Sequence, residues 1–143
     1  MKVEPYLMFE GRCDEALDFY RRALGAEVTM LMRYKDNPEA AAAQGCGQGA
    51  GAGPTPEMVM HAAFKVGGAQ LMASDGMGSG KPSFQGISLS LGAANAAEAR
   101  RYFDALAEGG QVQMPFGPTF FSPAFGMVAD RFGVSWMVVV EPQ

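Results

Sequence analysis

The sequence predicts an α+β fold built from two βαβββ modules that form a curved mixed sheet, with one helix packed behind each module. The order of apolar patterns is strand, helix, strand, strand, strand, and this order occurs twice along the chain. The two predicted helices also match in sequence, with each matched pair 83 residues apart. The matched pairs are Glu15-Ala16 with Glu98-Ala99 and Phe19-Tyr20 with Tyr102-Phe103. A repeat of about 70 residues is too long for a solenoid and indicates duplication of one module.

The first module is predicted from residues 5 to 75. Residues 5–10 predict a strand, and Cys13–Leu24 predicts a helix that ends at Gly25. Cys13, Leu17, Tyr20 and Leu24 are spaced by four, three and four residues, which places them on one helical face. Residues 26–34 then alternate as a strand, and residues 57–66 and 69–75 predict a hairpin across Gly67-Gly68.

The second module repeats this order. Residues 87–91 predict a strand, and Asn95 with Glu98 forms a capping box that opens a helix running to about Glu108. Its apolar face carries Ala99, Tyr102, Phe103 and Leu106. Residues 112–116 predict the next strand, and 125–130 with 134–140 predict a closing hairpin in which Trp136 belongs to the core.

We therefore divide the chain into a first module at residues 1–78 and a second at 79–143, together forming one domain. The 143 residues, 48% of them hydrophobic, suffice for a core. Residues from about 35 to 55 are rich in Gly and Ala, which predicts a mobile loop. Pairing of the two sheets makes a half-barrel whose concave side can hold a ligand.

Composition and charge exclude several classes of protein. The net charge is −4 at pH 7 and no Lys/Arg run is present, so we expect no nucleic-acid partner. No apolar run approaches the ~20 residues that span a bilayer, so we expect no membrane partner. The N-terminus carries no signal-peptide core, and the two cysteines, Cys13 and Cys46, form no C-x-x-C pair. These features predict a cytoplasmic protein with reduced thiols.

Common catalytic motifs are missing. His61 is the single histidine, so one chain cannot build a zinc site on two histidines. No G-x-S-x-G elbow is present. Gly76, Gly78 and Gly80 do not have the spacing of a dinucleotide-binding or phosphate loop, and we interpret them as turn residues.

Two stretches resemble a known family. The run E-A-L-D-F-Y-R-R-A-L-G-A-E-V at 15–28 and the run F-G-P-T-F-F-S-P-A-F-G-M-V-A-D-R-F-G-V-S-W-M at 116–137 are similar to the PhnB-like branch of the vicinal-oxygen-chelate superfamily. That superfamily includes glyoxalase I, extradiol dioxygenases and bleomycin-binding proteins. PhnB-like proteins usually carry Trp where this chain has Phe121.

The resemblance also implies four positions for the ligands of one divalent metal ion, which family enzymes hold with His, Gln or Glu. In this chain those positions fall at Pro5 or Tyr6, at Met72, at Ile87 or Ser88, and at Met137. Thioethers suit soft ions and a lone hydroxyl binds poorly. We therefore expect no metal ion and no other cofactor.

The same resemblance and the strand patterns suggest a substrate pocket. Its candidate residues are Tyr6, His61, Met72, Ser74, Ser88, Ser90, Phe121, Met137 and Glu141. Alternatives stay open for several of them. His61 is either a histidine at a solvent edge or interface, or a pocket acid/base or single metal ligand. Met72 and Met137 either pack in the core or line the pocket. Phe121 is a lid, a dimer contact or simple packing.

These observations lead to one main expectation and one alternative. We expect a homodimeric PhnB-like protein that binds a small organic molecule in an apolar pocket, either to sequester it or to carry out an unidentified reaction. The alternative is a metal-dependent lyase or isomerase resembling glyoxalase I that uses His61 and Glu141. A methyltransferase of the ubiquinone pathway is a further label for this branch, but no glycine-rich cofactor loop follows a strand here.

Overall fold

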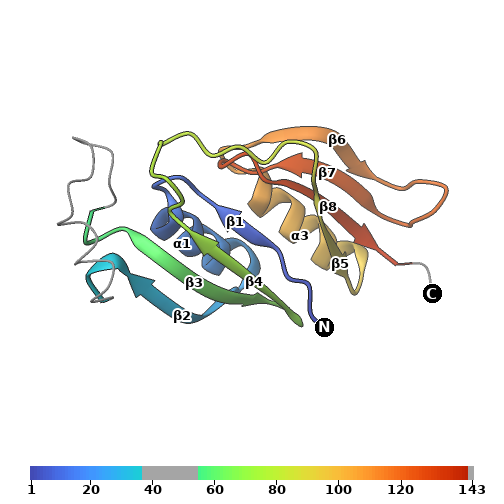
Figure 1. Cartoon of the computed structure of the whole chain (residues 1–143). Coiled ribbons are helices and arrows are strands. Elements are labelled where there is room, and N and C mark those ends of the chain that lie inside the picture. The colour runs from blue at the N-terminus through green and yellow to red at the C-terminus, as the bar shows by residue number, and fades with distance from the viewer. Residues whose placement is uncertain (37–54, 142–143) are drawn as a thin grey trace. The chain divides into compact units, whose positions relative to one another are not determined.

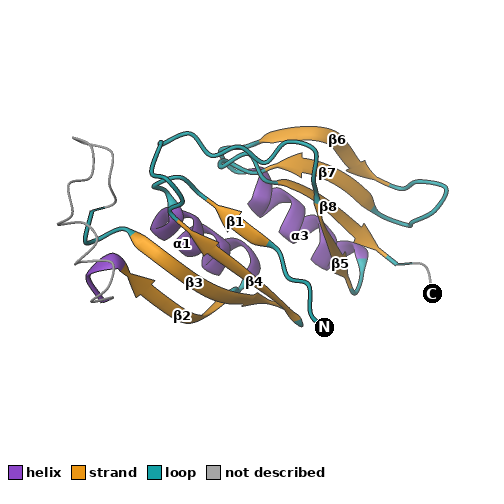
Figure 2. Cartoon of the chain, in the orientation of Figure 1, coloured by secondary structure: helices purple, strands orange, loops and turns teal. Residues whose placement is uncertain are grey.

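The computed structural model describes residues 1–36 and 55–141, which divide into two compact units, Met1–Pro82 and Ser83–Gln143. In each unit the described residues form one four-stranded mixed sheet and one α-helix (Figures 1 and 2). The predicted α+β class with two βαβββ modules is confirmed. The predicted Gly/Ala loop at about 35–55 lies, apart from its ends, outside the described residues.

The first unit follows the predicted order. Its elements are β1 (Tyr6–Met8), α1 (Cys13–Leu24), β2 (Glu27–Arg33), a 3-10 turn (Tyr34–Asp36), β3 (Val59–Val66) and β4 (Ala69–Ser74). The strand order across the sheet is β1-β4-β3-β2. β1 runs parallel to β4, whereas the other neighbours are antiparallel. Because β1 is the first strand and β4 the last, the sheet brings the two ends of the module side by side.

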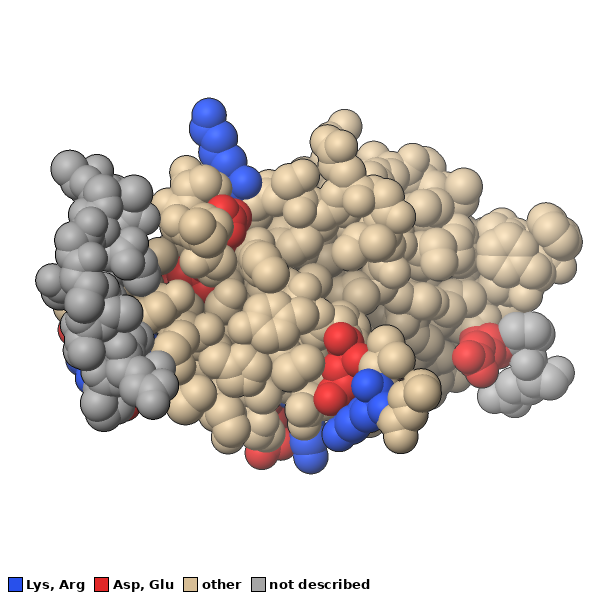
Figure 3. All heavy atoms as spheres, in the orientation of Figure 1, with Lys and Arg blue, Asp and Glu red and all other residues tan. Residues whose placement is uncertain are grey.

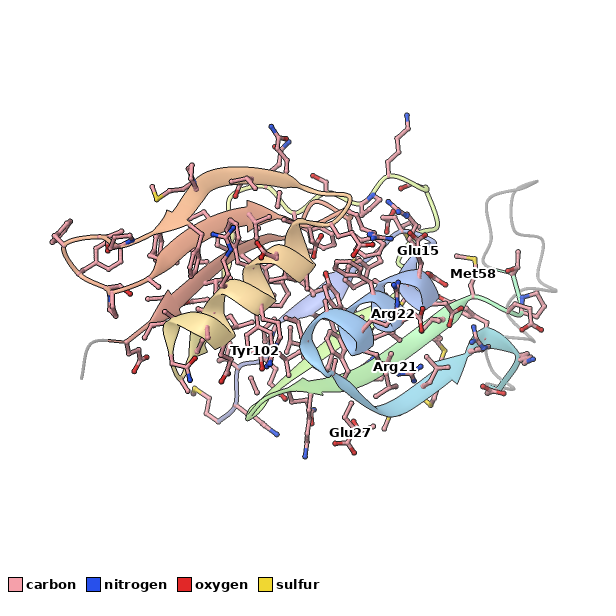
Figure 4. All side chains as sticks on the ribbon, turned by 180° about the vertical axis from the view of Figure 1, so that it is seen from behind. Glu15, Arg21, Arg22, Glu27, Met58 and Tyr102 are labelled. Carbon is pink, nitrogen blue, oxygen red and sulfur yellow. The ribbon has the colours of Figure 1, made fainter. Side chains whose placement is uncertain are left out.

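Helix α1 buries the predicted apolar face, Cys13, Leu17, Tyr20 and Leu24. The ring of Tyr20 stacks on Phe64 of β3 at a centroid distance of 6.0 Å, which fixes the helix against one face of the sheet. On its other side α1 carries charged residues. Figure 4 shows Glu15, Arg21 and Arg22 around the outer side of α1, and all three are exposed.

Asp75 ties the start of α1 to the sheet. Its carboxylate accepts hydrogen bonds from the backbone N–H of Cys13 at 2.8 Å and of Val59 at 2.7 Å, and only 4% of the residue is exposed. Its carbonyl accepts from the N–H of Gly78, so the residue also begins the predicted turn. The turn was expected, but the buried carboxylate that links helix and strand was not.

The second unit repeats the topology. Its elements are β5 (Leu89–Ala93), α3 (Ala96–Ala107), β6 (Gln111–Gly117), β7 (Phe125–Ala129) and β8 (Ser135–Val140), in the sheet order β5-β8-β7-β6. β5 runs parallel to β8. The first strand starts two residues later than predicted, so Ile87 and Ser88 lie in the connection before β5. Ile87 is 56% exposed. The strand was predicted to begin there because the apolar side chain of Ile87 continues the alternation, and this start was wrong.

The predicted cap of α3 is present, because Oδ1 of Asn95 accepts the N–H of Glu98 at 2.8 Å. Ala99, Phe103 and Leu106 are buried against the sheet. Tyr102, also assigned to the apolar face, is only half-buried.

Trp136 belongs to the core as predicted, with 3% of the residue exposed. Its Nε1–H donates to Oδ2 of Asp130 at 2.9 Å. Oδ1 of the same carboxylate accepts the N–H groups of Phe132 and Val134. Asp130 therefore organises the turn of the closing hairpin in the second unit, whereas Asp75 links the start of α1 to the start of β3 in the first.

Candidate functional site

Each sheet has one face covered by its helix and one face that is open. On the first sheet we call the uncovered side the first open face. Its residues follow from the strand register, because directly opposite residues share a face. One row runs Met30–Ala63–Met72–Tyr6 across β2, β3, β4 and β1, and beside it lie the pairs Met32–His61 and Ser74–Met8.

The first open face is apolar and exposed. Met8, Met30, Met32 and Tyr6 are 54%, 47%, 36% and 40% exposed. In Figure 3 the surface over the middle of this sheet is formed by uncharged residues, and Lys, Arg, Asp and Glu side chains lie toward its margins. Several large thioethers on one exposed face are unusual for a protein surface, and such patches mark binding sites.

Tyr6 and His61 interact across this face. The phenolic oxygen of Tyr6 lies 3.1 Å from Nδ1 of His61, and the ring centroids are 5.6 Å apart. Their strands are not neighbours, since β4 with Met72 lies between them. Within the part of the chain that the structure describes, Nε2 of His61 has no hydrogen-bond partner. Three predicted pocket residues, Tyr6, His61 and Met72, therefore lie together on this face, and Nε2 of His61 is available to a ligand.

Ser74, also a predicted pocket residue, is buried at 7% exposure. Its hydroxyl accepts the N–H of Gly76 at 3.0 Å. The side chain thus already has a structural partner in the turn after β4.

The second open face is the side of the second sheet away from α3. Here Met114, Met127 and Met137 lie directly opposite one another on β6, β7 and β8, and Ser90 of β5 lies opposite Met137. We call the three thioethers the methionine row. The structure thus places the predicted residues Ser90 and Met137 on one face.

A depression with a volume of about 420 Å³ opens on the second unit beside this row. It is lined by Gly86, Ile87, Ser88, Gln113, Met114, Met127 and Ser135. Ser88 was a predicted pocket residue, whereas Gln113, Met114, Met127 and Ser135 were missed. Period-two alternation over 125–129 separates Met127 from the buried Val128, but over 111–117 it groups Met114 with Val112 and Phe116, and Phe116 packs on Phe103 of α3. The register shifts on either side of Met114 turn its side chain to the open face, which the sequence pattern did not reveal.

Phe121 and Glu141 complete the predicted set. The ring of Phe121 packs edge-on against Phe125 at a centroid distance of 5.0 Å, while 45% of Phe121 stays exposed. Its neighbour Phe120 is 100% exposed. Glu141 follows β8 on the surface, beside Gly92 of β5.

The donor set does not fit the divalent ion that the resemblance implies. The positions implied for its ligands hold a phenol at Tyr6, thioethers at Met72 and Met137, and a hydroxyl at Ser88. Divalent ions of that kind prefer imidazole and carboxylate groups. Among residues 1–36 and 55–141, no three His, Cys, Asp or Glu side chains gather closely enough to hold an ion.

The glycine-rich connection after β4 is hydrogen-bonded to Glu10 of the same unit. Oε2 of Glu10 accepts the N–H of Met77 at 2.9 Å, and the carbonyl of Glu10 accepts the N–H of Gly80 at 2.7 Å. The bond from Met77 keeps the pKa of the Glu10 carboxyl below its ordinary value. Gly76, Gly78 and Gly80 all have positive φ, so they are turn residues as predicted. The connection leads to β5 and not to a helix, unlike a phosphate-binding loop.

None of the helices among the described residues has the length and apolarity needed to cross a membrane.

Comparison with known proteins identifies the family. A sequence model of the family described as 3-demethylubiquinone-9 3-methyltransferase matches residues 1–139. Protein YjdN of Escherichia coli is 38% identical over 145 residues, covering 100% of this chain and 97% of that protein.

Solved structures agree with this match. Protein PA1353 of Pseudomonas aeruginosa is 40% identical with a TM-score of 0.80, covering 100% of this chain and 99% of that one. The PhnB protein of Bacillus cereus is 30% identical with a TM-score of 0.77, covering 98% and 99%. A glyoxalase/bleomycin-resistance/dioxygenase domain from Frankia shares the fold at 14% identity and a TM-score of 0.62, covering 98% and 94%. Together with the two βαβββ modules, these matches show that the chain belongs to the PhnB-like family and shares its fold with a glyoxalase/bleomycin-resistance/dioxygenase domain.

Proposed function

We propose that this PhnB-like protein binds a small, largely apolar organic molecule without a hard divalent metal ion. The depression of about 420 Å³ on the second unit carries this proposal. Pockets for small organic ligands usually measure about 300–1,000 Å³ and combine an apolar lining with a few polar groups. Here Ile87, Met114 and Met127 supply apolar contact, while Ser88, Gln113 and Ser135 supply hydroxyl and amide groups, so the lining is mixed.

The thioethers favour an adaptable site. Methionine has three rotatable bonds and a polarizable sulfur, so it can follow the shape of different apolar ligands. Met127 stands between Met114 and Met137 in the methionine row. A ligand in the depression would therefore meet the thioethers of Met114 and Met127 together with the hydroxyls of Ser88 and Ser135.

The proposal includes a homodimer in the cytoplasm. Phe120 and Phe121 are 100% and 45% exposed at a loop tip, and covering them would remove apolar surface from water. Light scattering should then give twice the chain mass of 15.1 kDa. A mass of one chain in light scattering would mean that Phe121 has no role at a dimer interface.

Two other activities make different demands. A lyase or isomerase resembling glyoxalase I would need His61 and Glu141 to hold a metal ion and would turn over a glutathione hemithioacetal after addition of Ni, Zn or Mn. A methyltransferase would need a site for its methyl donor, and in the connection after β4 the amides of Met77 and Gly80 already donate to Glu10. The binding proposal needs neither of these features.

A fluorescence titration with N-phenyl-1-naphthylamine tests the proposal. This neutral, apolar probe becomes bright when it leaves water, and we expect saturable binding to the wild-type chain. M127K places a charge in the depression and should abolish binding. M77K changes a methionine that is 83% exposed outside the depression and should leave binding intact.

Circular dichroism spectra establish that both variants are folded. Equal probe binding by wild type and M127K, or a loss in both variants, would contradict the proposed site. Turnover of the hemithioacetal that depends on added metal and is lost in H61Q would favour the lyase alternative.

A further inference from the structure

The first open face carries a second kind of chemistry, which does not depend on the depression of the second unit. The side chains opposite and diagonal to His61 on this face include Met32, Met30 and Met72, which offer thioether sulfur beside the imidazole nitrogen. We propose that this face is a binding site for a soft monovalent metal ion, Cu(I), held by Nε2 of His61 together with the thioethers of Met32 and of Met30 or Met72.

The strand register brings these donors together. Met32 lies directly opposite His61 on the antiparallel pair β2–β3. Met30 and Met72 lie opposite Ala63, two residues along β3 from His61, and so occupy its diagonal positions on either side. Directly opposite Cβ atoms are ~4.5–5.5 Å apart and diagonal neighbours ~7–8 Å, within reach of long side chains. His61, Met32 and either one of the diagonal thioethers can therefore converge on one point above β3.

The donor types select the ion. Thioether sulfur prefers soft ions such as Cu(I), and imidazole accepts copper as well. Carboxylates favour hard divalent ions, and those around this face are placed or bonded elsewhere: the carboxylate of Glu10 accepts the N–H of Met77. Glu27 pairs with Lys65 four residues along β3, about 13 Å away at 3.3 Å per residue. Glu57, before β3, forms an ion pair with Lys35 at 3.0 Å.

Tyr6 orients the imidazole for this role. Ligand histidines usually bind metal through one ring nitrogen while the other is hydrogen-bonded to a nearby group. The Tyr6 hydroxyl lies 3.1 Å from Nδ1, which leaves Nε2 for the ion. Tyr6 does not touch the proposed ion itself, so it is a positioning residue.

The thioethers can also move without disturbing the core. Met30 and Met32 are 47% and 36% exposed, and Met72 is half-buried. Their reorientation toward an ion leaves the opposite face of the sheet, with Phe64 packed on Tyr20, unchanged. Binding should therefore cost little rearrangement of the fold.

The test uses the full chain without an affinity tag and with the substitution C46S, because the thiol of Cys46 would bind soft ions. Cys13 can remain, since it is 0% exposed and burial raises the pKa of its thiol. Isothermal titration with Ag(I), a redox-inert analogue of Cu(I), measures affinity in chloride-free buffer. Competition with bicinchoninate measures Cu(I) itself.

We expect one tight ion per chain. H61F and M32L should each weaken binding more than Y6F, for which we expect a loss of about tenfold, as is usual for a residue that orients a ligand. M72L and M30L should show which diagonal thioether contributes. Leucine keeps the apolar volume, so these variants retain the sheet.

Two matched controls keep the site assignment falsifiable. M77L changes a methionine outside the face, and M127L interrupts the methionine row of the second unit; neither should alter the affinity. Methyl NMR signals of Met32 and of Met30 or Met72 should shift with Ag(I), whereas that of Met77 should not.

Absence of binding would overturn the proposal, as would equal affinity in wild type and the M32L and H61F variants. Loss of binding in M127L would also overturn it, because the ion would then occupy the second unit. None of these outcomes changes the result expected with N-phenyl-1-naphthylamine, so the two proposals can fail separately.

Discussion

The hydroxyl of Tyr6 lies 3.1 Å from Nδ1 of His61, although β1 and β3 are separated by β4. The two side chains therefore reach over the strand that carries Met72. This contact joins β1 and β3 above the first open face and orients the imidazole of His61, the single histidine of the chain.

We predict that Y6F changes the state of the His61 ring more than the stability of the fold. Loss of one hydrogen bond on an exposed face should cost less than about 1 kcal/mol in the free energy of unfolding. The balance of imidazole tautomers, measured by ¹⁵N NMR of the ring, should shift clearly. Y34F, which changes the 3-10 turn, is the control. Unchanged ring signals in Y6F would show that the contact does not form in solution.

Much of the fold could be predicted because it depends on local signals. The spacing of Cys13, Leu17, Tyr20 and Leu24 defined α1 to the residue, and the Asn95 cap began α3 at the expected place. Strand boundaries were less certain because alternation alone does not say where pairing stops. Ile87 continues the apolar alternation of β5 but lies outside the strand.

The candidate site was harder to predict, since it depends on which strands become neighbours. Tyr6 and His61 were both candidates, but their contact follows from the order β1-β4-β3, which no local pattern reveals. Met127 was missed for the same reason, because its importance arises from lying between Met114 and Met137. The roles of Asp75 and Asp130 also depend on tertiary partners.

We predict that D75A strongly destabilises the first unit. The substitution leaves the buried N–H groups of Cys13 and Val59 without their acceptor, and hydrogen bonds to charged groups contribute about 1.5–3 kcal/mol each. A loss of about 3 kcal/mol or more is expected in urea unfolding. D18N alters an exposed ion pair with Arg22 and should change stability by less than about 0.5 kcal/mol. Similar midpoints for D75A and D18N would contradict the proposed role of the buried carboxylate.

Gly110 should tolerate no side chain. A Cβ at this position would meet the carbonyl oxygen of Ala129, with Asp130 Cα at 3.0 Å, and backbone atoms cannot move aside as a side chain can. We expect G110A to lower the free energy of unfolding by about 1–3 kcal/mol, the usual effect of overpacking. G68A is the matched control, because nothing lies within 4 Å of its added Cβ. Equal stability of the two variants would mean that the turn after α3 relaxes freely.

Cys13 should be unreactive while the chain is folded. The residue is 0% exposed, and burial, followed by the charge of Asp75, raises the pKa of its thiol, so little thiolate forms near neutral pH. In the C46S background, Ellman's reagent should label no thiol in the native protein and one thiol per chain in urea. Rapid labelling without denaturant would show that α1 opens readily at its first turn.

The hydrogen bonds of the Glu10 carboxylate to the connection after β4 should make the free energy of unfolding depend on pH in the acidic range. The N–H of Met77 and then the hydroxyl of Ser79 lower the pKa of this carboxyl in the folded chain below its ordinary value of 4.5. A carboxyl with a lowered folded pKa stabilises the native state above the unfolded pKa, and that stability is lost as the pH falls through the folded value. Wild type should therefore be more stable than E10Q at neutral pH, and the difference should shrink below pH 4.5.

Urea midpoints measured between about pH 3 and 7 test this, with S79A expected to show part of the effect. A constant difference between wild type and E10Q over that range would mean that the charge of Glu10 does not hold the connection after β4.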